Sequence, residues 1–285
     1  MMTDLHMPED GEPLPRPTSE LMKRVVSAVV LGFAALASAW VGGLVFLLVW
    51  AAAALAVWWE WSGIVKTEPR PLLAGVGAAA ILCMAVALAL DAAAIAFVCA
   101  VIGAGVAMAS VQTGRAWAGA GVIYAAAALV PAVMLRGDPA FGLVAIFWLF
   151  AVVWAQDTGA YFAGRLIGGP KLAPAISPGK TWSGAAGGLI AGIAAGTMVV
   201  LLAAVELRAM HIVIAFVIVV AAMLGDLLES WMKRRFGAKD SGALIPGHGG
   251  VMDRIDGFIA AAAVALAIGL VRGGTDTPAT GLLAW

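Results

Sequence analysis

Residues 230–256, SWMKRRFGAKDSGALIPGHGGVMDRID, form a polar stretch in a chain that is otherwise strongly apolar. The stretch holds five of the 17 Lys and Arg residues, three of the 17 Asp and Glu residues and five glycines. Apolar runs long enough to cross a membrane lie on both sides of it, at about 210–228 and 255–271. It therefore predicts a connection between two membrane spans, and its charges mark the place where chemistry is expected.

The composition indicates an integral membrane protein. The 285 residues are 63% hydrophobic and 12% charged, with a mean hydropathy of +1.00, whereas soluble domains are about 25% charged. The formal net charge of zero argues against a nucleic-acid partner, which would need a basic surface. Cys83 and Cys99 lie inside apolar runs, so neither a disulfide nor a thiolate metal site is expected.

Apolar runs divide the chain into membrane spans of about 20 residues each. Residues 25–59 are too long for one span, and Gly42-Gly43 interrupts them, which predicts a hairpin of two spans. Seven further runs follow at about 71–90, 92–110, 116–135, 140–160, 184–205, 210–228 and 255–271. We therefore predict an all-α polytopic membrane protein with about nine transmembrane helices.

Three regions follow from this pattern. Residues 1–22 are polar and carry four prolines, which predicts a disordered cytoplasmic tail. Residues 23–136 form the N-terminal transmembrane helices, and 137–285 form a C-terminal transmembrane catalytic domain. In that domain we expect two cytoplasmic loops, at 157–182 and 226–256.

Positive charges set the expected orientation. With the N-terminus inside and nine spans, 14 of the 17 Lys and Arg residues fall on the inner side. An even number of spans would place the polar loops on conflicting sides. We therefore expect the protein in the plasma membrane, the inner membrane of a bacterium, with both polar loops and the active site facing the cytoplasm.

The first polar region begins within an apolar helix, at Asp157. A carboxylate at membrane depth costs several kcal/mol unless it is paired or faces a wet cavity. Asp157 is therefore a candidate site residue; the structural alternative is an ion pair with Arg165.

Further along the same region, Ser177-Pro-Gly-Lys180-Thr181 offers two hydroxyls and an ammonium group that could bind phosphate. It is not a P-loop, because Pro174 stands where that motif requires glycine.

The second polar region carries more charge. Helical spacing places Asp226, Ser230 and Lys233 on one helix face, and Asp253 and Asp256 on another. Between them lies a glycine-rich segment, with Arg254 just beyond it; the segment contains the polar residues Lys239, Asp240 and His248. His248 could act on a substrate or serve as a structural hydrogen-bonding group.

Carboxylates beside cations at a membrane boundary are the components of a Mg²⁺-assisted phosphoryl-transfer site. The alternative is that the cations only satisfy the positive-inside rule, which does not account for four acids among clustered glycines.

Two long motifs resemble the phosphatidate cytidylyltransferase family, also called CDP-diacylglycerol synthases. The later one runs from Ser230-x-x-Lys-Arg through Lys239-Asp-x-Gly to Pro246-Gly-His-Gly-Gly-x-x-Asp-Arg-x-Asp256. The earlier one comprises Asp157-Thr-x-Ala-Tyr, Gly164-Arg and Ile176-Ser-Pro-x-Lys-Thr-Trp182. The resemblance covers residues 140–271. Gly179 and Gly257 depart from it, because relatives often carry Lys and Ser there.

The resemblance implies that CTP and phosphatidic acid, a membrane lipid, react to give CDP-diacylglycerol and pyrophosphate with Mg²⁺ as cofactor. The resemblance is also compatible with a second bound cation and with a homodimer. It implies catalytic roles for Asp226, Ser230, Lys233, Asp253 and Asp256. Of these, Asp226, Asp253 and Asp256 would be the metal ligands. It implies substrate-binding roles for Asp157, Ser177, Lys180, Thr181, Lys239, Asp240, His248 and Arg254.

Three alternatives use the same residues differently. A CTP-dependent lipid or polyprenol kinase would transfer the γ-phosphoryl group of the nucleotide. An ion-coupled transporter would place Asp157, Asp226 and Asp256 along a path through the membrane, but the charges gather at one membrane face and no inverted repeat is evident. A membrane scaffold would have no need for the clustered acids and glycines.

Overall fold

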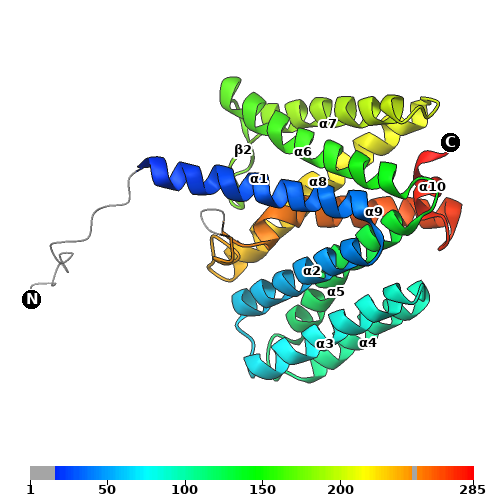
Figure 1. Ribbon diagram of the computed structural model, residues 1–285. Coiled ribbons are helices and arrows are strands. Elements are labelled where there is room, and N and C mark those ends of the chain that lie inside the picture. The colour runs from blue at the N-terminus through cyan, green and yellow to red at the C-terminus, as the bar shows by residue number, and fades with distance from the viewer. Residues whose placement is uncertain (1–16, 246–248) are drawn as a thin grey trace, which may run out of the picture.

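A computed structural model describes residues 17–245 and 249–285 of the protein, which form a helical bundle with one small hairpin (Figure 1). The helices are α1 (Pro17–Val41), α2 (Gly43–Val65), α3 (Arg70–Ala89), α4 (Ala93–Ala109), α5 (Arg115–Gly137), α6 (Gly142–Leu166), α7 (Trp182–Leu202), α8 (Ala209–Arg235), α9 (Met252–Gly273) and α10 (Pro278–Leu283). The strands β1 (Lys171–Ala173) and β2 (Ser177–Thr181) pair antiparallel between α6 and α7. The prediction of an all-α membrane protein is confirmed.

Seven helices of the described chain are long and apolar enough to cross a membrane: α2, α3, α5, α6, α7, α8 and α9. Two more apolar segments, Val25–Val41 of α1 and Ala93–Ala109 of α4, are shorter. Both coincide with expected spans, and the total of nine stays a prediction.

Several helices extend beyond the expected boundaries. The first polar region is helical to Leu166 and then forms the hairpin, and α8 continues to Arg235, so only parts of the two expected loops are irregular. Residues 1–16 of the expected tail lie outside the described residues. Residues 17–22 are helical, not disordered, because α1 begins at Pro17, where proline fits the first turn of a helix.

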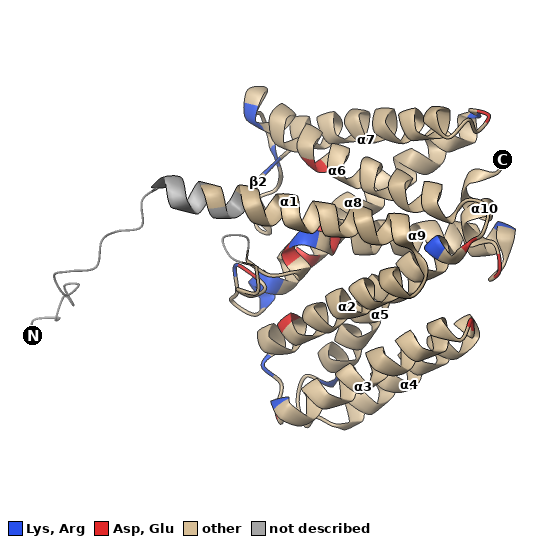
Figure 2. Cartoon of the chain, viewed as in Figure 1, with Lys and Arg blue, Asp and Glu red and all other residues tan. Residues whose placement is uncertain are grey.

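Charged residues gather at one end of the bundle, where β2 and the final turns of α8 lie, as Figure 2 shows. We call this the β2 end, and the opposite end the α10 end. Lys180, Arg234 and Arg235 lie at the β2 end, with acidic residues of α8 and α9 beside them. The ends of the spans therefore carry the chemistry, and their middles are apolar.

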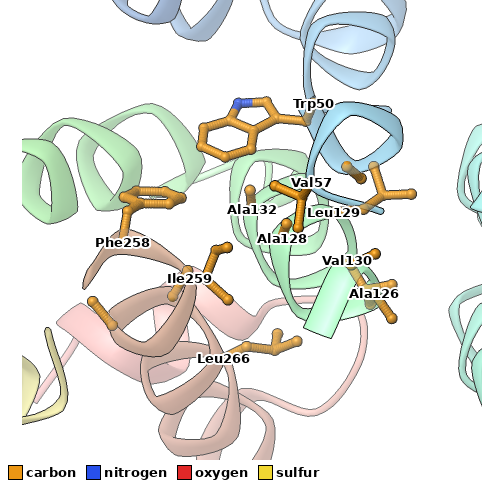
Figure 3. Packing of buried hydrophobic residues seen from close by; sticks show 14 of the residues in the cluster. Trp50, Val57, Ala126, Ala128, Leu129, Val130, Ala132, Phe258, Ile259 and Leu266 are labelled. Carbon is orange, nitrogen blue, oxygen red and sulfur yellow. The ribbon is translucent and has the colours of Figure 1, made fainter. Parts of the chain in front are cut away.

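Aromatic and aliphatic side chains join the two halves of the chain. In Figure 3, Trp50 of α2 faces Phe258 of α9, and Leu129 of α5 lies beside Val57 of α2; the rings of Trp50 and Phe258 stack at 4.7 Å. Helices α2 and α5 both pack on α9. The N-terminal helices thus support the helix that carries Asp253 and Asp256.

Small residues let α6 and α7 approach closely. Every fourth residue of α7 from Gly184 to Gly196 is a buried glycine, the others being Gly188 and Gly192. A Cβ at Gly188 would lie 2.8 Å from the backbone oxygen of Gln156 on α6. This close packing follows the small-residue pattern of membrane helices, and Asp157 of α6 lines one cavity with residues of β2 and α7.

Asp138, between α5 and α6, anchors the C-terminus at the α10 end. It is 3% exposed; its Oδ1 accepts hydrogen bonds from the N–H groups of Ala140 and Phe141 at 2.9 and 3.0 Å. Its Oδ2 accepts from the Thr280 N–H at 2.6 Å, and its Oδ1 from the Thr280 hydroxyl at 3.1 Å. Burial alone would raise the pKa of Asp138, but these hydrogen bonds outweigh it and lower the pKa.

We expect Asp138→Asn to lower the free energy of unfolding by about 1–3 kcal/mol, because an amide group would face a buried N–H donor. The folded-state pKa is depressed, so the carboxylate stabilises the protein above its unfolded pKa and this stabilisation is lost as pH falls through the folded pKa. Thermal melts in detergent should show a gap from wild type at pH 7 that narrows in acid. The exposed Asp276→Asn is the control; equal melting of Asp138→Asn and wild type at pH 7 would contradict the anchor.

Candidate active site

A cavity of about 430 Å³ opens at the β2 end between α6, the hairpin, α7 and α8. Its lining includes Gln156, Asp157, Tyr161, Lys180, Thr181 and Asp226. Asp157, Lys180, Thr181 and Asp226 were predicted as site residues. The structure therefore brings residues of both polar regions to one cavity.

An ion pair joins the two regions across the cavity. Lys180 Nζ on β2 lies 2.5 Å from Asp226 Oδ2 on α8. Thr181 precedes α7, and its hydroxyl accepts a hydrogen bond from the Gly184 N–H at 3.0 Å, which caps that helix. The cap joins the end of β2 to the start of α7, next to Lys180, whose side chain reaches Asp226 on α8.

Three carboxylates act on one another around this ion pair. Asp256, in the first turns of α9, interacts electrostatically with Asp226 and Asp157, and with the ammonium group of Lys180. The Gly257 N–H donates to Asp256 Oδ1 at 2.7 Å. The cations whose charges act on Asp157 are Lys180 and Arg254; Arg165, the expected alternative partner, donates to the Tyr161 hydroxyl at 3.4 Å. Three acids and two cations thus act on one another here, and no group of three or more Asp, Glu, His or Cys side chains in the described residues is arranged to hold a metal ion by itself.

Asp253 belongs to a second, adjacent network. Its Oδ1 accepts from Lys233 Nζ at 2.5 Å, and its Oδ2 accepts from the N–H groups of Ser241 and Gly250 at 3.0 and 2.9 Å. Lys233 also pairs with the buried Glu229 at 2.7 Å. Asp253 thereby ties both arms of the glycine-rich segment to α8.

The two networks share α8. Ser230 donates to Asp226 at 3.4 Å, and Lys233 lies one turn further along the same face. We expected Asp226 and Asp253 to share a metal ion. The charges of Asp226 and of Asp256 on α9 act on each other, and the sharing of a metal ion by Asp226 and Asp253 stays a prediction.

Other predicted site residues lie outside the cavity. Lys239 and Asp240 are exposed in the glycine-rich segment, and Ser177 begins β2 without lining the cavity. His248 lies outside the described residues. At Gly179, which does line the cavity, a Cβ would meet no atom within 4 Å, so the departure from the motif leaves open space there.

Sequence reasoning missed Glu60, in the last two turns of α2. Glu60 is 3% exposed; its Oε1 accepts from the Val251 N–H at 2.8 Å, and its Oε2 accepts from the Met252 N–H at 2.8 Å and the Ser241 hydroxyl at 3.1 Å. A Glu near the end of an apolar span is a signal that could have been used, since buried membrane carboxylates are functional candidates by default. Glu60 makes the N-terminal half part of the site's support.

Carboxylates can hold a metal ion and lysines can neutralise phosphate oxygens, which are the needs of enzymes that act on phosphate-bearing substrates. Residues 22–271 match the cytidylyltransferase family. The chain is 43% identical over 263 residues to the phosphatidate cytidylyltransferase of Brucella suis biovar 1, covering 91% of this chain and 97% of that protein. The chain belongs to the cytidylyltransferase family.

More distant relatives match a shorter part of the chain. The phosphatidate cytidylyltransferase of Haemophilus influenzae is 46% identical over 129 residues, which cover 44% of this chain and 45% of that protein. That of Bacillus subtilis is 41% identical over 126 residues, covering 44% and 47%.

Proposed function

We propose that the protein is a phosphatidate cytidylyltransferase, which converts CTP and phosphatidic acid into CDP-diacylglycerol and pyrophosphate. The observation that carries this is the Lys180–Asp226 ion pair, which unites the two motifs in one cavity of a chain whose relatives are named for this activity. The acids and lysines of the two networks lie toward the β2 end of the bundle, and the other acids lie mainly at the α10 end rather than along the middle (Figure 2), which disfavours an ion path through the membrane.

The reaction needs two anionic substrates brought into line. An oxygen of the phosphatidate phosphate attacks the α-phosphorus of CTP, a new P–O bond forms, and the bond to pyrophosphate breaks. Lys180 offers positive charge to the triphosphate from β2, and Arg254 offers it to the phosphatidate phosphate from α9. Catalysis rests on positioning and charge neutralisation.

The Mg²⁺ that this reaction class uses would need substrate oxygens besides the carboxylates of the protein, because no group of three or more ligand side chains in the described residues could hold a metal ion by itself. Asp226 and Asp256 would hold the ion, with Asp157 close enough for its charge to contribute. Mg²⁺ prefers carboxylate oxygens and is commonly held by one or two of them together with substrate phosphates. The bound ion would neutralise charge on the phosphate oxygens. Asp253 and Lys233 would position the glycine-rich segment over the substrate.

The site's location suits its substrates. We place the protein in the inner membrane with the β2 end facing the cytoplasm, because most Lys and Arg residues lie at that end. CTP would reach the cavity from water, and the lipid would reach it from the inner leaflet.

The test is turnover by the purified protein in detergent with phosphatidic acid, CTP and Mg²⁺. We expect CDP-diacylglycerol and pyrophosphate in equal amounts, and no product when EDTA removes the metal. Formation of CDP with a phosphorylated lipid would instead identify a kinase and overturn the proposal.

A further inference from the structure

A second cavity, of about 310 Å³, lies between α1 and a wall formed by α2, α6 and α9. We call it the α1 groove. Its lining is apolar, with Gly32 of α1, Ala53 of α2, Phe150 and Trp154 of α6, and Phe258 of α9 among its residues. Among the described residues that line it, Arg254 is the one charged group.

The groove runs from the membrane boundary toward the middle of the bundle. At the β2 end it begins at Val251 and Arg254, and its deeper residues Trp50 and Phe150 lie near the middle of α2 and in the first half of α6. Along α1 it extends from Ala28 to Ala35, about 10 Å at 1.5 Å per residue. One end is thus cationic and the other apolar, as a lipid with an anionic head group requires.

Helix α1 separates the groove from the surrounding lipid. Val29 and Phe33, on the outer face of α1, are 64% and 72% exposed. Exposed apolar side chains on a membrane helix face hydrocarbon. An acyl chain could therefore enter the groove sideways from the bilayer, along an edge of α1.

The groove and the active-site cavity follow one another along one face of α6, because residues three and four apart share a helix face. Trp154 lines the groove and Asp157, three residues later, lines the cavity. Arg254 lines the groove, and its charge acts on Asp157. A phosphate bound by Arg254 would therefore sit beside the acidic cluster.

We infer that the α1 groove binds an acyl chain of the phosphatidate, with Arg254 directing the lipid phosphate toward the acidic cluster. This inference rests on the proposed function and assigns the lipid part of the same site. The nucleotide occupies the cavity lined by Lys180 and Asp226, and the acceptor lipid approaches it along α6 from the neighbouring groove.

The groove can be filled without disturbing the fold. A Cβ at Gly32 would meet no atom within 4 Å, so Gly32→Phe projects into open space, and Phe is a better helix former than Gly. We expect this variant to raise the KM for long-chain phosphatidate at least about tenfold, because the phenyl ring would take the space of the acyl chain and a misfit of one methylene in an apolar pocket costs about 10- to 200-fold. The KM for CTP should stay unchanged, and the defect should shrink with dihexanoyl phosphatidate.

Gly105→Phe is the matched control. Gly105 lies on α4, is exposed and likewise has no atom within 4 Å of a Cβ, and it lies far in sequence from every residue that lines the groove. We expect wild-type kinetics for it. Equal KM values for long-chain phosphatidate in the two variants, with active wild-type protein, would overturn the inference while leaving the proposed function standing.

A second measurement needs no variant. A phosphatidate with a photoreactive diazirine in its acyl chain should label peptides of α1 and α6 in the wild-type protein, and unlabelled phosphatidate should compete. Labelling confined to other helices would overturn the inference. A change of oligomeric state in Gly32→Phe with unchanged lipid kinetics would also overturn it, since the groove would then be a contact between two copies. Wild-type protein without any turnover would refute the proposed function and the inference with it.

Discussion

Asp226→Asn is expected to lower kcat at least ~100-fold, the size of effect typical for loss of a ligand to a catalytic metal. Asp226 lies in the cavity, pairs with Lys180 at 2.5 Å and accepts from Ser230 at 3.4 Å. The amide keeps the shape of the side chain but removes the charge that would hold the metal and orient Lys180. Initial rates of CDP-diacylglycerol formation at saturating CTP measure the loss.

The control for Asp226→Asn is Asp91→Asn, which removes an exposed carboxylate at the α10 end. We expect wild-type activity for Asp91→Asn and similar melting temperatures for both variants. If Asp226→Asn kept activity within a few-fold of wild type, Asp226 would not be a catalytic residue and the cavity would not be the place of catalysis.

Glu60→Gln is expected to lower kcat by about 10- to 100-fold, the range found for residues that position a metal or substrate site without touching the reacting atoms. Each carboxylate oxygen of Glu60 accepts a backbone N–H, one from Val251 and one from Met252. In glutamine one of these oxygens becomes an NH₂ group, so either orientation of the amide leaves one buried N–H facing a donor. The glycine-rich segment would shift, and Asp253 with it.

A positioning role for Glu60 predicts a specific kinetic pattern. The loss should appear in kcat and in the KM for CTP, and Glu60→Asp should recover part of the activity, because it keeps both acceptors on a shorter side chain. The exposed Glu206→Gln should behave like wild type. If Glu60→Gln lowered the melting temperature but left kcat and both KM values unchanged, Glu60 would be structural only.

The helical spans could be predicted from the sequence because hydropathy depends on local composition. The predicted span at 140–160, for example, corresponds to α6, which the structure extends to Leu166. That extension was not predicted, because its polar residues line a cavity formed with α7 and α8 rather than facing lipid.

The pairing of the two polar regions could be suspected from their motifs, but the partners within them could not. Lys180 meets Asp226, 46 residues later, because α6 and α7 pack closely through glycines. Glu60 was missed for a similar reason: its partners are 181 to 192 residues away, and no local pattern in α2 indicates them. Long-range hydrogen bonds depend on how helices pack, which a single sequence does not reveal.

The roles of Asp253 and Asp256 differ most between the sequence prediction and the structure. Helical spacing grouped Asp253 with Asp256, three residues apart on α9. In the structure Asp253 holds the glycine-rich segment, whereas Asp256 interacts with Asp226 and Asp157. The segment at 230–256 therefore supports a site whose cavity is lined by α6, the hairpin, α7 and the part of α8 that precedes the segment.

The central claim is nucleotidyl transfer at this cavity, and the fate of labelled phosphate in CTP tests it most directly. With phosphatidic acid and Mg²⁺, we predict that label from the α-phosphate of CTP appears in the lipid product and label from the γ-phosphate appears in pyrophosphate. The Asp226→Asn variant should show neither transfer at a comparable rate. Label from the γ-phosphate in the lipid, or α-label that never leaves the aqueous phase, would contradict the account.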